Sequence, residues 1–386
     1  MKNKLKRILF ITGTRADYGK LKPLMLRVEK SNDFICNIFI TGMHMLKVYG
    51  ETHEEIKKSG FKNNYLFINQ IAMGGSDNMD MILSKTVDGL GHYIREFQTD
   101  LIIVHGDRVE ALAGAIVGAL NNILVCHIEG GELSGTVDEL IRHSISKLSH
   151  IHFVANNSSK KRLVQMGESK SSIFIIGSPE VDIMLSDKLP KISEVKKRYE
   201  IPFNKYCIFI YHPVTTELGD LRNNIKSSIN ALLKSGKQFI IIYPNNDTGS
   251  NIIINQYDKI KGNINFKIFE SLRFEYYVVL MKNADIMIGN SSAGVREASV
   301  FGVPSINIGS RQKNRSTHPS IINVDDNEND ILRAINSDPK KFTPSLAFGK
   351  GNSSKLFMET ISNKTFWDTP NQKQFNDVEL IGEFND

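Results

Sequence analysis

Short apolar runs alternate with longer amphipathic segments along most of the 386-residue chain. Each run is rich in Ile, Val and Phe and ends in Gly, Asp, Asn or Ser, which predicts buried β-strands separated by helices. This βαβ alternation is typical of a parallel sheet covered by helices on both faces. The first predicted strands lie at residues 7–13, 36–42, 101–107, 123–130, 151–156 and 172–178, and helix-like segments between them include 19–30, 80–97, 109–120 and 138–149.

The pattern changes at a lysine-rich, proline-containing segment, SDKLPKISEVKKRYEIP, and then starts again. We interpret this segment as the link between two Rossmann-like domains, at residues 1–183 and 184–352. The tail, about 353–386, is expected to be helical at its start and to pack back on the first domain. Strands of the second domain are predicted at 206–213, 238–245, 264–269, 284–290 and 304–309.

Composition narrows the class of protein. Apolar residues make up 41% of the chain and charged residues 23%, as in soluble globular proteins. Apolar runs of about 18 residues, as a membrane span requires, are absent from the sequence. Cys36, Cys126 and Cys207 lie inside apolar runs, so we expect buried, reduced thiols and a cytoplasmic location. The net charge of +6 is scattered, which suits an anionic small ligand better than nucleic acid.

Two glycine-containing turns are candidates for binding anions. GTRADYGKL (13–21) follows the first strand but lacks both the dinucleotide and the P-loop spacing, so Arg15 and Lys20 either contact an anion or remain solvated cations. GNSSAGVREA (289–298) places two serines between a strand and a helix, where free N–H groups favour a diphosphate. There Ser291 and Ser292 would bind phosphate and Glu297 ribose hydroxyls, although Ser291 also suits a simple helix cap.

The segment HIEGGELSGTVDE (127–139) places four acids after a buried strand, where an unused carboxylate is costly. Neighbouring parallel strands would bring Glu129 close to Asp107, which ends the preceding strand, and ligands of such sheets bind at the carboxyl ends. Asp138 is either a third site acid or a helix cap. His212, at the end of a second-domain strand, faces the same cleft. Glu132 is interpreted as a solvated loop acid, Glu139 as a helix-start charge, and the glycines as a close turn past the ligand.

A metal site is not expected. The sequence contains neither HExxH nor DxD, and Arg15, Arg108 and Arg142 would compete with a metal ion for the carboxylates. A nucleophile elbow of the form GxSxG is also absent.

Ordered motifs give the chain a family resemblance. It closely resembles the hydrolysing UDP-N-acetylglucosamine 2-epimerases of bacterial sialic-acid synthesis, from residue 7 to about 315, and enzymes of legionaminic-acid synthesis are similar. The motifs are GTRADYGKL, TGMH, HGDRVEALAGA, HIEGGELSGTVDELIRHSISKLSHIH, GSPEVDIM, HPVTTE, YPNNDTG, SLRFEYY, GNSSAGVREA and NIGSRQ.

The resemblance implies a GT-B-like fold with the site between the two domains, a reaction without metal or nicotinamide cofactor, and a homodimer or higher homo-oligomer. UDP would be eliminated to give a 2-acetamidoglucal, and water would then add to release N-acetylmannosamine. The positions that match the family's catalytic residues are Asp107, Glu129, Asp138 and His212. Arg108 and Asn245 match further positions around the ligand, and the stretch from Ser271 to Arg273 is expected near the uracil.

Three alternatives remain open from the sequence. The same chemistry could act on UDP-2,4-diacetamido-2,4,6-trideoxyglucose, whose extra groups would be read by unplaced side chains. A GT-B glycosyltransferase would share the fold and the diphosphate loop but has no need for three clustered acids. A catalytically inactive nucleotide-sugar-binding module would be expected to lack one of the acids.

Overall fold

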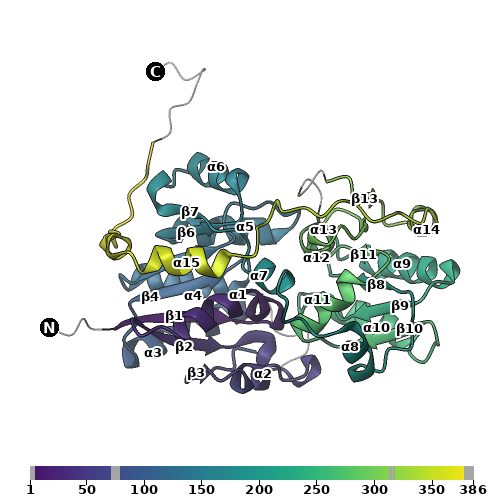
Figure 1. The fold of residues 1–386 in the computed structure, drawn as a ribbon, viewed down its shortest axis with the longest axis horizontal. Helices are drawn as coiled ribbons and strands as arrows, with labels where there is room; N and C mark the ends of the chain where they lie inside the picture. Colours follow the sequence, from purple (N-terminus) through teal and green to yellow (C-terminus); the bar gives the residue numbers. More distant parts are fainter. Residues whose placement is uncertain (1–4, 71–78, 313–314, 316–317, 378–386) are drawn as a thin grey trace, which may run out of the picture.

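The computed structural model describes residues 5–70, 79–312, 315 and 318–377. Within these residues the chain forms two parallel sheets with helices packed around them (Figure 1). The first has the strand order β3-β2-β1-β4-β5-β6-β7 and the second β10-β9-β8-β11-β12-β13. In both orders the chain moves outward in one direction and then crosses to the other side of the first strand, which is the doubly wound arrangement.

The apolar runs form the strands, as predicted. Their central members are buried on both faces, which explains why they are continuous rather than alternating in hydrophobicity. The strands of the first sheet are β1 (Lys6–Thr12), β2 (Phe34–Ile40), β3 (Asn63–Leu66), β4 (Leu101–His105), β5 (Leu124–Ile128), β6 (Ile151–Val154) and β7 (Ile173–Ile175). Those of the second are β8 (Cys207–Ile210), β9 (Phe239–Ile242), β10 (Phe266–Phe269), β11 (Met287–Gly289), β12 (Ser305–Ile308) and β13 (Ile321–Val324).

Helices connect the strands. In the first part of the chain they are α1 (Arg15–Glu29), α2 (His53–Lys58), α3 (Met79–Glu96), α4 (Val109–Leu120), α5 (Val137–Leu148), α6 (Asn157–Gln165) and α7 (Glu180–Met184), with 3-10 turns at η1 (Gly42–Met45), η2 (Lys47–Tyr49) and η3 (Lys170–Ser172). Later helices are α8 (Ile192–Arg198), α9 (Leu221–Ser235), α10 (Ser250–Asp258), α11 (Phe274–Lys282), α12 (Ser292–Val295), α13 (Glu297–Val300), α14 (Glu328–Asn336) and α15 (Ser353–Ile361), followed by η4 (Lys364–Asp368).

Helix α1 begins four residues before the predicted segment 19–30, at Arg15. Thr14 and Asp17 form a capping box, in which the Thr14 hydroxyl accepts a hydrogen bond from the Asp17 N–H and the Asp17 carboxylate accepts one from the Thr14 N–H, both at 3.1 Å. Because these two bonds satisfy N–H groups at the helix start, the helix extends back to the end of β1.

The tail returns to the first domain, as predicted. Helix α15 lies beside α1 (Figure 1). Phe357, Ile361 and Phe366 are buried in the same core cluster as Ile8 and Phe10 of β1. The exact residues at which one domain ends and the other begins stay a prediction.

Two further observations bear on the protein class. All three cysteines are buried and form no disulfide within the described chain. Across the residues that the structure describes, every helix is too short or too polar to cross a membrane.

Candidate active site

A cavity of about 250 Å³ lies between the two domains. Its walls follow β1, β4 and β5 in the first domain and β8 to β11 in the second, so it is built from the carboxyl ends of both sheets. Every predicted site residue lines it except Arg273. Other residues of the lining include Asp17, His105, Arg142, Tyr277, Arg311 and Arg315.

Glu129 follows β5 and is only 3% exposed. Its φ of +69° is unusual for a residue with a Cβ and costs about 1–3 kcal/mol of backbone strain, which the surroundings must hold in place. Arg296 donates to both carboxylate oxygens, at 2.9 Å and 2.5 Å, and the Nε2 of His105 lies 3.3 Å away. Burial alone would raise the pKa of Glu129, but Arg296 and Lys20 outweigh it and hold the pKa well below its usual range.

Asp107 and Asp138 line the same cavity, and their pKa values are shifted in opposite directions. Burial would raise the pKa of Asp107, but Arg142, which donates to its carboxylate, lowers it together with Arg315 and Arg311. Burial and the nearby Asp107 charge raise the pKa of Asp138, despite a 3.1 Å hydrogen bond from Arg311. The pKa values of these two neighbouring carboxylates are therefore shifted in opposite directions, lower for Asp107 and higher for Asp138, a separation that suits acid–base chemistry.

Asp138 is not the cap of α5. The cap is Thr136, whose hydroxyl accepts a hydrogen bond from the Asp138 N–H at 3.3 Å. The Asp138 carboxylate lines the cavity and is bound there by Arg311, which favours the interpretation of a site acid over that of a helix cap.

His212 follows β8, and its ring has a defined tautomer. The Asn245 N–H donates to Nδ1 at 3.0 Å, so the proton of the neutral ring sits on Nε2. Burial, together with Arg311 and Arg108, lowers the pKa of His212 well below its usual value. Asn290 fixes the backbone here, accepting from the His212 N–H at 2.6 Å and donating to its C=O at 2.9 Å. His212 can therefore act as a neutral donor toward the cavity.

The loop after β11 differs from its predicted form. The stretch 289–298 is not one helix but two short ones, α12 and α13, with a break at Arg296. Ser291 caps α12 by accepting from the Ala293 N–H at 3.3 Å, and both Ser291 and Ser292 line the cavity. Ser291 therefore caps a helix and also lines the cavity, and its role in phosphate binding stays a prediction.

Several predicted binding residues join the two domains. Arg15, at the start of α1, donates to Ser271 of the second domain and pairs with Glu55 at 3.0 Å. Arg108 donates to the side chain of Asn246 at 2.8 Å. Both arginines line the cavity, but part of their hydrogen-bonding capacity is already used by the protein.

Lys20 and Glu297 also line the cavity and face each other. The Lys20 Nζ lies 3.4 Å from Glu297, 3.7 Å from Glu180 and 3.9 Å from Glu129. Burial would lower the pKa of Lys20, but these three carboxylates raise it, so it stays charged. Much of this charge is balanced by protein carboxylates, which leaves less of it for an anionic ligand than the sequence suggested.

Arg273 is the predicted residue that the structure places elsewhere. It precedes α11 and its side chain is 44% exposed, paired with Glu275 at 3.0 Å and Glu55 at 3.6 Å. The neighbouring Ser271 and Leu272 supply the cavity wall instead.

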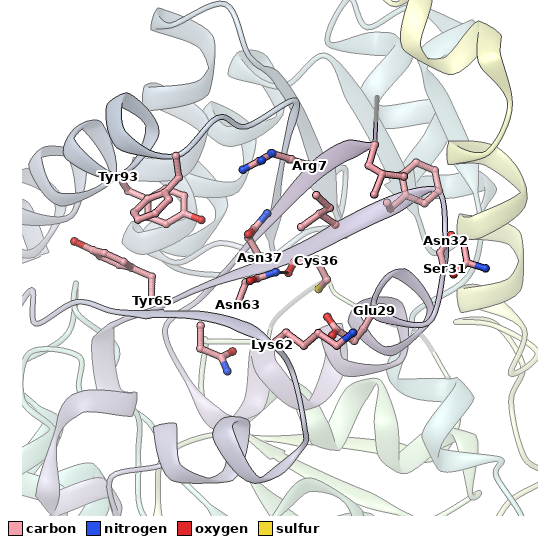
Figure 2. Close-up of a pocket in the computed structure, with 15 residues that line it drawn as sticks. Arg7, Glu29, Ser31, Asn32, Cys36, Asn37, Lys62, Asn63, Tyr65 and Tyr93 are labelled. Atoms are coloured by element: carbon pink, nitrogen blue, oxygen red, sulfur yellow. Dashed lines mark hydrogen bonds between the residues drawn. The ribbon is translucent and has the colours of Figure 1, made fainter. Parts of the chain in front are cut away.

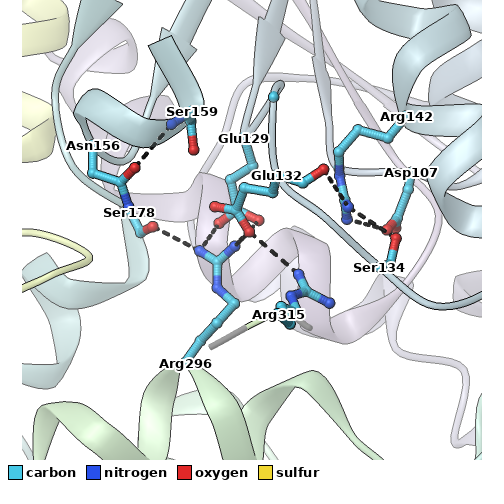
Figure 3. A network of polar contacts seen from close by, with 12 residues as sticks. Asp107, Glu129, Glu132, Ser134, Arg142, Asn156, Ser159, Ser178, Arg296 and Arg315 are labelled. Atoms are coloured by element: carbon cyan, nitrogen blue, oxygen red, sulfur yellow. Dashed lines mark hydrogen bonds and ion pairs between the residues drawn. The ribbon is translucent and has the colours of Figure 1, made fainter. Parts of the chain in front are cut away.

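Glu132 is not a solvated loop acid, so that interpretation was wrong. It is 5% exposed, accepts from Arg296, and pairs with Arg315 at 3.3 Å (Figure 3). The loop glycines do not pass the ligand cavity either: a Cβ on Gly131 would meet Ser159, and one on Gly135 would meet the Ser310 backbone. Their small size allows close packing against protein.

Arg296, Arg311, Arg315 and His105 were not predicted as site residues. Arg296 and Arg311 lie inside the motifs GNSSAGVREA and NIGSRQ. Buried carboxylates need cationic partners. The segment HIEGGELSGTVDE contains four acids and no Lys or Arg, which indicated that arginines or lysines from other parts of the chain must pair with them.

Within the described chain, His, Cys, Asp and Glu side chains form no group of three or more arranged to hold a metal ion. A second hollow, of about 710 Å³, lies at the opposite end of the first sheet, beside the starts of β1, β2 and β3 (Figure 2). Arg7, Asn37 and Asn63 line it. Because ligands of parallel sheets bind at the carboxyl ends, the interdomain cavity is the better candidate site.

Comparison with known proteins identifies the fold and the family. In solved structures, the chain matches UDP-GlcNAc 2-epimerase from Neisseria meningitidis bound to UDP-GlcNAc, with a TM-score of 0.77, 22% identity and coverage of 92% and 99% of the two chains. The Methanocaldococcus jannaschii enzyme in complex with UDP-GlcNAc and UDP also has a TM-score of 0.77, at 23% identity, with coverage of 92% and 99%. These matches establish the GT-B-like fold.

Other known proteins share a higher sequence identity with this chain. The chain is 48% identical to a UDP-N-acetylglucosamine 2-epimerase of Neisseria meningitidis serogroup B, covering 93% of this chain and 95% of that protein. It is 36% identical to the Legionella pneumophila UDP-N,N'-diacetylbacillosamine 2-epimerase (hydrolyzing), covering 91% and 94%. The family model described as UDP-N-acetylglucosamine 2-epimerase matches residues 26–362. Fold, interdomain site and sequence thus agree that this chain belongs to the UDP-N-acetylglucosamine 2-epimerase family.

Proposed function

We propose that the protein is a hydrolysing 2-epimerase that converts UDP-N-acetylglucosamine and water into N-acetylmannosamine and UDP. The observation that carries the proposal is that Asp107 and Asp138 line one interdomain cavity, where their surroundings shift their pKa values in opposite directions. An epimerase that works through a 2-acetamidoglucal needs one group to remove a proton and another to return one.

The first step is an elimination. The C1–O bond breaks and its electron pair leaves with UDP, while the C2 proton passes to a carboxylate and a C1=C2 double bond forms. The C2 proton is only weakly acidic until C1 becomes cation-like, so stabilising the departing diphosphate is essential. His212 suits this role through its Nε2–H, together with the hydroxyls of Ser291 and Ser292.

The second step is hydration. Water gives its oxygen to C1 and its proton to a carboxylate, and C2 receives a proton on the opposite face, which produces the manno configuration. In this proposal Asp138 holds the proton that is returned, and the ionised Asp107 and Glu129 are the acceptors.

N-acetylglucosamine is the favoured sugar because the chain is 48% identical to the serogroup B enzyme and 36% identical to the Legionella enzyme. The 2,4-diacetamido sugar nucleotide is the second candidate, since that relative covers the chain equally well. A homo-oligomer acting in the cytoplasm belongs to the same proposal, and light scattering after gel filtration tests the oligomer.

The decisive experiment incubates the pure protein, without added metal, with each UDP-sugar in deuterated water. We expect free UDP and a manno-configured sugar with deuterium at C2. Return of an epimerised UDP-sugar would mean a non-hydrolysing enzyme, and transfer to an acceptor would mean a glycosyltransferase.

Matched variants test the carboxylates. We expect Asp107→Asn and Glu129→Gln each to lose about 100-fold or more in kcat, because each amide removes a proton acceptor without changing size. Glu139→Gln is the control, since Glu139 lies in the first turn of α5 and outside the cavity lining. Near-normal turnover by both test variants would contradict the proposal.

A further inference from the structure

Arg296 lies at the break between α12 and α13 and is 1% exposed. It does not line the cavity. Its φ of −95° and ψ of −68° end one short helix and begin the next. Figure 3 shows its side chain leaving the second domain and pointing at the carboxylates of the first.

The guanidinium meets a set of partners from the loops after β5 and β7. Besides Glu129, it donates to Glu132, to Glu180 at 2.9 Å and to the Ser178 hydroxyl at 2.6 Å. The ring of Phe348 lies against it, 5.0 Å from centroid to guanidinium carbon. One cation therefore joins three buried carboxylates that would otherwise repel one another.

Only Glu129 among these three carboxylates also lines the cavity. Arg296 grips both of its oxygens, which fixes the rotation of the carboxylate as well as its position. His105 and Lys20 approach only one oxygen each, Oε2, at 3.3 Å and 3.9 Å. The orientation of the other oxygen depends on Arg296.

We propose that Arg296 is a positioning residue for the reaction: it reaches from the second domain and holds the Glu129 carboxylate in one orientation toward the cavity. This inference rests on the proposed function, in which Glu129 accepts a proton. A lysine could supply the charge, but not two parallel hydrogen bonds. The arrangement also makes Glu129 dependent on the second domain, because its main partner lies there.

The test variant is Arg296→Lys, which keeps the positive charge but loses the two parallel N–H donors of the guanidinium. We expect kcat to fall about 100-fold, the loss that a misplacement of about 1 Å causes, with KM nearly unchanged because Arg296 does not touch the cavity. The pKa of Glu129 should rise, so the acid limb of the pH–rate profile should move to higher pH.

Lys22→Met is the matched control. Lys22 pairs across the domains with Glu275 at 2.6 Å, and neither residue lines the cavity. Both proteins should bind UDP like the unmodified protein in calorimetry. A normal kcat with an unmoved acid limb in Arg296→Lys would overturn the inference. A loss of UDP binding and of thermal stability that matches the loss in kcat would overturn it too, because Arg296 would then have only a structural role.

Two further measurements keep the inference testable. If Arg296→Lys fails to fold, Arg296→Gln with Glu132→Gln removes one buried charge of each sign and should show the same shift of the acid limb. Carbon-13 NMR of glutamate carboxyls, with Glu129→Gln assigning the signal, reads the pKa of Glu129 without turnover. An unchanged pKa of Glu129 in the variant would show that the inference has failed. Failure of the proposed function would instead appear in the unmodified enzyme.

Discussion

His212 carries a residue-scale prediction through its tautomer. An asparagine at position 212 would place its amide group only where Nδ1 of the ring lies. A glutamine there can place an amide N–H where the Nε2–H of the ring lies. We expect His212→Asn to lose about 100-fold in kcat, as when one donor to a developing charge is removed, and His212→Gln to lose distinctly less. Steady-state kinetics on both variants, with matched melting temperatures, make the comparison.

The pH dependence follows from the same residue. Because the pKa of His212 lies well below its usual value, protonation of this ring should contribute no limb near pH 6.5 to the rate profile. An imidazole-like limb that disappears in His212→Gln would contradict the neutral-donor role.

At the scale of single residues, every site residue predicted from the sequence except Arg273 lines the interdomain cavity, because the ends of buried strands can be recognised in the sequence. Asp107 and Glu129 follow apolar runs directly, and parallel strands must bring such ends together. Glu132 was misassigned because its partner Arg296 lies 164 residues away in the chain. Burial by a remote partner leaves no local signature, and pattern reasoning therefore assigned this acid to solvent.

Among the elements, the end of β11 leaves no room for a Cβ atom. A Cβ on Gly289 would lie 1.9 Å from the Ile210 carbonyl oxygen, and its φ is +126°. We expect Gly289→Ala to destabilise the protein by about 2–4 kcal/mol and to weaken UDP binding, because the adjacent Asn290 holds His212. Thermal unfolding and calorimetry measure the two effects.

Gly219→Ala is the control for Gly289→Ala. Gly219 lies in the turn before α9, and nothing lies within 4 Å of the position that its Cβ would take. It should leave both quantities unchanged. A Gly289→Ala protein with normal stability would show that β11 and β8 can separate without consequence.

Every interior strand was predicted from its apolar run, whereas two of the four edge strands were missed. β3 reads NNYL and β13 reads IINV, and neither was predicted. Each is the outermost strand of its sheet and is paired on one side only. Both β3 and β13 are short and partly exposed, and asparagines interrupt their apolar residues, so neither has the continuous apolar run that marked the predicted strands.

For the whole molecule, α1 of the first domain packs closely against α11 of the second. A Cβ on Gly19 would lie 2.6 Å from the ring of Phe274. We expect Gly19→Ala to lower kcat/KM and to increase the radius of gyration in X-ray scattering, although alanine favours the helix itself by about 1 kcal/mol. The cavity needs both domains, so a wider gap weakens it.

Gly91→Ala in α3 is the matched control, because it gains the same helix propensity and meets only the flexible end of Arg95. Equal kinetics and equal dimensions for the two variants would mean that the Gly19 contact does not set the spacing.

In this chain, Arg296 of the second domain forms ion pairs with Glu129, Glu132 and Glu180 of the first, so we expect these pairs to limit how the domain can be exchanged with that of a relative. A hybrid enzyme could be made from the first domain of one relative and the second domain of another. It would combine the residue at the position of Arg296 with carboxylates from a different parent. Such a hybrid keeps a working site only if the arginine and its three carboxylates come from the same parent. The useful unit of exchange is therefore this group of four side chains, not the domain.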